Sequence, residues 1–140
     1  MVDCYQSLGW TVDLVLPIPL GRKRMHERGY NQADLLARPF ALATGLSYSS
    51  RSVWRERETA SQVGLGAAQR LENVAGAFKA DPKQVSGRRV LMIDDVATTG
   101  ATISACASAL LAAGALDVWG LTLARAVVHP GQAVAVGNSI

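Results

Sequence analysis

Residues 90–102 constrain the fold more than any other part of the chain. The four apolar residues 90–93 predict a strand that is buried on both faces. Two adjacent carboxylates, Asp94 and Asp95, follow where that strand is expected to end, and the small and hydroxyl residues 97–102 lead into a helix. The start of a helix binds phosphate through backbone N–H groups, and carboxylates accept hydrogen bonds from sugar hydroxyls. The run therefore predicts a site for a sugar phosphate.

The rest of the chain alternates strand-like and helix-like segments. Buried strands are expected at 12–16 and 117–127, and helices at 31–44, 67–75 and directly after residue 102. This alternation predicts an α/β fold, an open parallel sheet with helices on both faces.

Four local features complete this outline. The charged segment 21–29 is expected to be a loop, and 81–87 a surface turn. Residues 53–54 are typical of an edge strand. Pro39 lies inside the helix predicted at 31–44, so we expect a kink or two shorter helical pieces there.

Length and composition favour one intracellular domain. A chain of 140 residues with 49 % hydrophobic residues can build one core, which we expect over residues 1–130, with a frayed tail at 131–140. No run of 18 apolar residues occurs, so we expect no membrane association, and the first residues lack a secretory pattern. The two cysteines, Cys4 and Cys106, have no neighbouring His, which indicates neither a zinc site nor a disulfide framework. A cytoplasmic location is expected.

The positive charge is concentrated in the first half of the chain. Residues 1–70 contain nine Lys and Arg against six Asp and Glu, whereas residues 71–140 contain five of each. Four of the nine cations fall between positions 22 and 28. This surplus suits a polyanionic small ligand and a nucleic acid equally well.

The order of residues in 90–102 resembles the phosphoribosyl-pyrophosphate (PRPP) signature of type I phosphoribosyltransferases. The resemblance implies the fold of that superfamily and implies that Asp94 and Asp95, as the catalytic pair, approach the ribose hydroxyls. The residues that would surround the 5′-phosphate are Ala97, Thr98, Thr99, Gly100, Ala101 and Thr102. An acid at a strand end and Gly-Ala-Thr at a helix start also occur in other α/β proteins, so Asp-Asp alone does not decide between these alternatives.

A second resemblance covers roughly residues 12–126. Pro-Ile-Pro-Leu at 17–20, Lys-Arg at 23–24, Arg-Gly-Tyr-Asn-Gln at 28–32 and the segments 57–62 and 70–78 are similar to the competence protein F (ComF) branch of the superfamily. In that branch the segment 17–28 corresponds to the pyrophosphate loop and 55–62 to a flexible loop that closes over PRPP. The implied pyrophosphate-binding residues are Pro19, Leu20, Lys23 and Arg28, and the implied flexible-loop residues are Arg57, Thr59 and Gln62.

The chain departs from the ComF pattern before its first predicted strand. ComF proteins commonly carry a four-cysteine zinc-binding segment there, and here only eleven residues precede Val12. The part that often recognises the accepting base is therefore expected to be missing, in a naturally short variant or an incomplete chain.

Together the resemblances imply a Mg²⁺-dependent phosphoribosyltransferase that transfers phosphoribose to an amine or base and releases pyrophosphate. Mg²⁺ would be held through PRPP, with no direct protein ligand and a water-mediated contact to Asp94 or Asp95. The alternative is a non-catalytic PRPP-fold protein that assists single-stranded DNA uptake or recombination in competence. Candidate partners are PRPP, an amine or base acceptor, single-stranded DNA or DNA-uptake proteins, and a second copy of the chain. The sequence does not name the acceptor.

Overall fold

The computed structural model describes residues 1–59, 63–97 and 100–125. Its central element is a four-stranded parallel sheet in the order β2-β1-β5-β6. The strands are β1 (Leu14–Pro17), β2 (Ser47–Tyr48), β5 (Arg89–Ala97) and β6 (Asp117–Arg125). The predicted α/β fold with an open parallel sheet is confirmed.

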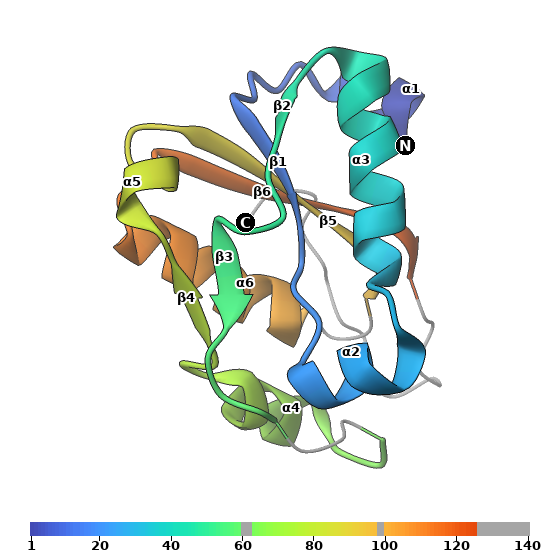
Figure 1. The fold of residues 1–140 in the computed structure, drawn as a ribbon, viewed down its shortest axis with the longest axis vertical. Helices are drawn as coiled ribbons and strands as arrows, with labels where there is room; N and C mark the ends of the chain where they lie inside the picture. Colours follow the sequence, from blue (N-terminus) through green and yellow to red (C-terminus); the bar gives the residue numbers. More distant parts are fainter. Residues whose placement is uncertain (60–62, 98–99, 126–140) are drawn as a thin grey trace.

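Helices cover both faces of this sheet (Figure 1), as predicted. On one face lie α1 (Val2–Leu8) and α3 (Gln32–Thr44), and on the other lies α6 (Ala101–Ala112). Successive residues of β1 and β5 point to opposite faces, which supplies a core to each side. The α6 side receives Leu14, Leu16, Val90 and Met92, and the α3 side receives Val15, Leu91 and Ile93.

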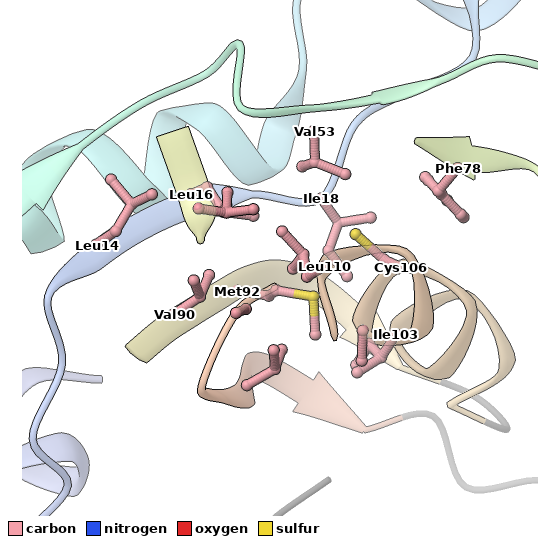
Figure 2. Packing of buried hydrophobic residues seen from close by; sticks show 14 of the residues in the cluster. Leu14, Leu16, Ile18, Val53, Phe78, Val90, Met92, Ile103, Cys106 and Leu110 are labelled. Carbon is pink, nitrogen blue, oxygen red and sulfur yellow. The ribbon is translucent and has the colours of Figure 1, made fainter. Parts of the chain in front are cut away.

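Figure 2 shows the core on the α6 side, where Met92 of β5 and Leu16 of β1 share one cluster with Ile103, Cys106 and Leu110 of α6. These side chains of α6 recur at spacings of three and four residues, which places them on one face of the helix. The helix predicted after residue 102 is therefore confirmed, and its buried face holds it against β1 and β5.

A second, smaller sheet packs on the α6 side. Strand β3 (Val53–Arg55) pairs antiparallel with β4 (Phe78–Ala80), and both contribute to the cluster of Figure 2. The strand expected at 53–54 is present, but it belongs to this sheet and not to the edge of the parallel one. Helix α4 (Ala67–Val74) matches the predicted helix at 67–75.

The structure corrects three local predictions in helices. Segment 21–29 is not a loop, because Arg22–Arg28 form helix α2, which ends at Gly29 with φ 76°. Segment 81–87 contains the short helix α5 (Pro82–Val85), capped by the Asp81 side chain. Helix α3 runs through Pro39 as one element, so the expected division into two pieces is wrong. Proline has no N–H to donate to the carbonyl group four residues earlier in the helix. Because Pro39 is exposed, water can bond to that carbonyl group instead.

Strand β5 is longer than its apolar run predicts. It continues from Arg89 through Asp94 and Asp95 to Ala97, because β6 pairs with it over this whole length. The acidic pair therefore lies within the carboxyl-terminal half of the strand and not after its end.

Strand β6 is described as far as Arg125, and the remaining positions of the strand predicted at 117–127, together with the tail 131–140, lie outside the described residues. Across the described ranges, no helix combines the length and the apolar character that crossing a bilayer demands.

Candidate functional site

The strand order reverses between β1 and β5. Within the sheet, the chain continues from β1 to its neighbour β2, whereas the later strands β5 and β6 lie beyond the opposite edge of β1. In open α/β sheets ligands bind at such a switch point, outside the carboxyl ends of the strands. A cavity of about 290 Å³ lies there. Its lining comes from the segment after β1, α2, the starts of α3 and α6, the end of β3 and the end of β5.

One wall of the cavity carries the two carboxylates of β5. Each accepts a hydrogen bond from the next backbone N–H: Asp95 N donates to Asp94 Oδ1 and Val96 N donates to Asp95 Oδ1, both at 2.9 Å. The pKa of Asp94 is raised to about 7, chiefly by burial; the side chain and charge of Asp95 also raise it, whereas the backbone N–H bond from Asp95 and the charge of Arg55 lower it. The pair is therefore suited to hydrogen bonding with hydroxyl groups or to binding a nearby cation.

The amino-terminal end of α6 opens onto the same cavity. Gly100 caps this helix in the left-handed conformation, with φ 78° and ψ 4°, a backbone geometry that favours glycine. Gly100, Ala101 and Thr102 all line the cavity. Because the amino-terminal end of a helix carries partial positive charge, this region is suited to a phosphate group.

Three arginines form the cationic part of the lining. Arg24 and Arg28 stand four residues apart on α2 and so share one face of that helix, and Arg55 ends β3. Arg28 Nη1 donates to Oε1 of Gln32 at 3.1 Å, and Arg55 Nη1 donates to Oγ1 of Thr59 at 2.7 Å. Carboxylates, a helix start and guanidinium groups thus meet in one cavity, which can hold a ligand with hydroxyl groups and more than one anionic group.

Known proteins are similar to this chain in sequence and in fold. No protein-family model matches the chain. The chain is 39 % identical over 109 residues to the DNA utilization protein YhgH of Escherichia coli (strain K12), covering 76 % of this chain and 48 % of that protein. It is 35 % identical over 116 residues to competence protein F of Haemophilus influenzae, covering 80 % and 51 %.

The fold is similar to that of glutamine PRPP amidotransferase from B. subtilis, with a TM-score of 0.58, 23 % identity and coverage of 86 % of this chain and 24 % of that one. The chain is therefore similar in sequence to competence protein F and YhgH, and its fold is that of the type I phosphoribosyltransferases. It spans about half the length of the curated relatives that it matches.

The structure brings most of the site residues named from the two resemblances into one place. Those that line the cavity are Pro19, Leu20, Arg28, Thr59, Asp94, Asp95, Ala97, Gly100, Ala101 and Thr102. Gln62, Thr98 and Thr99 lie outside the described residues.

Lys23 and Arg57 do not line the cavity. Lys23 lies next to Arg24 on α2, and neighbouring helical positions point about 100° apart. Arg57 Nη2 donates to the carbonyl oxygens of Asn73 and Ala75, at 3.1 and 2.8 Å, so it holds its segment to the end of α4.

Seven residues that line the cavity were not among the site residues assigned from the sequence, and four of them are polar or charged: Arg24, Asn31, Gln32 and Arg55. The spacing of four residues between Arg24 and Arg28 is a signal in the sequence, once 22–28 is taken as a helix. No comparable signal marks Arg55, since its place depends on the pairing of β3 with the distant β4.

Among the residues that the structure describes, no group of three His, Cys, Asp or Glu side chains is placed to hold a metal ion. Asp94 and Asp95 nevertheless fit a hydrated Mg²⁺ that also binds ligand oxygens. Two adjacent carboxylates, one with a pKa raised by burial, are stabilised by a nearby hard cation.

Proposed function

We propose that this chain binds PRPP together with Mg²⁺ in the cavity between β1 and β5, and that it is a phosphoribosyltransferase-type protein of the reducing cytoplasm. In this proposal it transfers phosphoribose to an amine or base and releases pyrophosphate. One observation carries the proposal: a single cavity contains the two carboxylates of β5, the start of α6 and three arginines. PRPP has a ribose diol, a 5′-phosphate and a pyrophosphate, which match these three groups chemically.

Each part of the cavity has a separate role in the proposal. Asp94 and Asp95 accept hydrogen bonds from the ribose hydroxyls, and the start of α6 binds the 5′-phosphate. Arg24 and Arg28 bind the pyrophosphate. Asp94 and Asp95 would hold a hydrated Mg²⁺ ion through water, and the ion would supply positive charge to offset that of the pyrophosphate.

The chain's own contribution to transfer would be positioning and charge stabilisation. Negative charge grows on the pyrophosphate as its bond to the ribose breaks, and the fixed guanidinium groups stabilise that charge. The carboxylates keep the ribose in place by holding its hydroxyls.

A calorimetric titration with PRPP tests the proposal, run with Mg²⁺ and again with EDTA. Ribose 5-phosphate is the ligand control, because it lacks the pyrophosphate. We expect micromolar PRPP binding that requires Mg²⁺ and weaker binding of ribose 5-phosphate. Equal binding of the two ligands, or none, would remove the basis of the proposal.

A second candidate function is the handling of single-stranded DNA without catalysis. The names of the relatives YhgH and competence protein F point to DNA use and competence. Arg22 and Lys23 of α2 are exposed and lie outside the cavity lining, where a phosphate backbone can reach them. Replacing both with Gln should weaken binding of a single-stranded oligonucleotide and reduce its salt dependence while leaving PRPP binding unchanged. An unchanged oligonucleotide affinity would exclude this surface.

A further inference from the structure

Strand β6 forms one edge of the parallel sheet and differs from the opposite edge in length. The opposite edge is β2, which has two residues, whereas β6 extends over the nine residues Asp117–Arg125. Among the residues that the structure describes, no strand pairs with the outer side of β6. Proteins protect such edges with Pro, Lys, a bulge or a very short strand, because unpaired backbone N–H and C=O groups bind other strands. The nine residues of β6 include neither Pro nor Lys, so its outer side is suited to pairing.

Strand β6 also leaves a large apolar side chain in contact with water. Leu123 is 61 % exposed, although Leu121, two positions earlier, is buried on the α3 side of the sheet. Alternation along the strand places Trp119, Leu121 and Leu123 on the same face. Trp119 is half-buried and stacks on Trp10, with the ring centroids 5.5 Å apart. An apolar side chain that arrives beside Trp119 therefore meets a ring that is already held in place.

The sequence of β6 is complementary to itself when two copies run in opposite directions. In an antiparallel pair centred on Leu121, Asp117 of each copy lies opposite Arg125 of the other. The same register places Trp119 of each copy opposite Leu123 of the other. Asp117 and Arg125 are both exposed, and opposite charges and aromatic–aliphatic pairs directly across a ladder are favourable. Any shift of this register would separate Asp117 from Arg125.

We propose that β6 pairs antiparallel with β6 of a second copy of this chain, so that the two four-stranded sheets become continuous. A two-fold axis at Leu121 makes the interface isologous, because each contact then occurs twice. The proposal does not rest on the proposed function. Ala97 lines the cavity and is the partner of Arg125 in the β5–β6 ladder. The second copy therefore lies one strand away from the cavity wall.

Sedimentation velocity over a range of protein concentrations tests this proposal on the full chain. The forms compared are wild type, Arg125→Asp, Asp117→Arg, the double variant with both changes, and the control Arg51→Asp. Arg51 is exposed and lies outside β6, so its variant makes the same change of charge elsewhere. Asp117 also lies beside Arg89 in the β5–β6 ladder, which makes Arg125→Asp the more specific of the two single variants.

We expect the wild type to form a dimer and each single variant to raise the dimer dissociation constant about tenfold or more, because like charges then lie opposite each other. The double variant should regain most of the wild-type affinity, since its two charges are exchanged and attract again. The control should behave like the wild type.

Three results would overturn the proposal. The first is a wild type that stays monomeric at every concentration, and the second is a dimer that the single variants leave unchanged. The third is a double variant that dimerises as weakly as the single variants do. Should a variant fail to fold, amide hydrogen exchange of the wild type decides. The amides of 117–125 should exchange more slowly at concentrations where the dimer forms, and rates independent of concentration would exclude β6 as the interface.

Discussion

Asn31 ties the start of α3 to the segment after β1 by bonding to Ile18. Its Nδ2 donates to the carbonyl oxygen of Ile18 at 2.9 Å, while its Oδ1 accepts from the N–H of Ala33 at 3.1 Å and so caps the helix. Both Ile18 and Asn31 line the cavity. The side chain therefore stabilises a helix and sets one boundary of the site.

Replacing Asn31 should separate these two roles. We expect Asn31→Ala to lower the free energy of unfolding by about 1–2 kcal/mol, because both bonds are lost. Asn31→Ser should cost less, since Ser retains the cap but is too short to reach Ile18. Urea denaturation measures both values, and an Ala variant as stable as wild type would contradict the role of the bond.

Replacing Asp94 should make the ligand-free protein more stable at high pH. The pKa of Asp94 is raised to about 7 in the folded state, so between pH 4 and 7 the folded protein keeps a proton that the unfolded chain has released. Stability therefore falls as the pH rises through this window, and Asp94→Asn removes the fall. We expect the variant to melt about 5 °C higher than wild type at pH 8 and near the wild-type Tm at pH 4. Equal differences at the two pH values would show that Asp94 does not titrate as inferred.

The pair formed by Asp13 and Arg89 should stabilise the protein in the opposite pH range. Arg89 Nε and Nη2 bond to the two carboxylate oxygens of Asp13 at 2.9 Å, and this pairing lowers the pKa of Asp13 to about 2. The contribution of this ion pair to the free energy of unfolding is present above pH 4 and is lost as the pH falls towards 2, because Asp13 is then protonated. Asp13→Asn should therefore be less stable than wild type at pH 6, and the gap should close by pH 2. A gap that stays constant in thermal melts across this range would rule out the ion pair as its source.

The cations of α2 should differ in their effect on pyrophosphate binding. Arg24 and Arg28 line the cavity, whereas Lys23 does not. We expect Arg24→Gln and Arg28→Gln each to weaken pyrophosphate binding roughly tenfold, and Lys23→Gln to change it by less than about twofold. Calorimetry on the three variants decides between this order and the assignment of Lys23 from the sequence. A large loss for Lys23→Gln would favour the sequence assignment.

The sequence predicted the parts of the fold that local patterns determine. Apolar runs marked β1 and β5, and the helix predicted at 31–44 matches α3 closely. Helix α2 was missed because all of its residues are exposed, so it has no apolar stripe.

Features that depend on distant pairing were not predictable in the same way. The extension of β5 through Asp95 comes from its pairing with β6, which no local pattern records. Arg55 reaches the cavity because β3 pairs with a strand more than twenty residues away. Asp94 and Asp95 could therefore be assigned to the site from the sequence, whereas Arg55 could not.

The most direct test of the central claim is a calorimetric titration of PRPP with Mg²⁺ into the wild type and into the double variant Asp94→Asn, Asp95→Asn. The amides preserve the shape of the two side chains and remove their charge. The account predicts micromolar binding to the wild type and none detectable to the double variant, with both proteins folded by circular dichroism. Unchanged PRPP binding in the folded double variant would contradict the assignment of this cavity as the PRPP site.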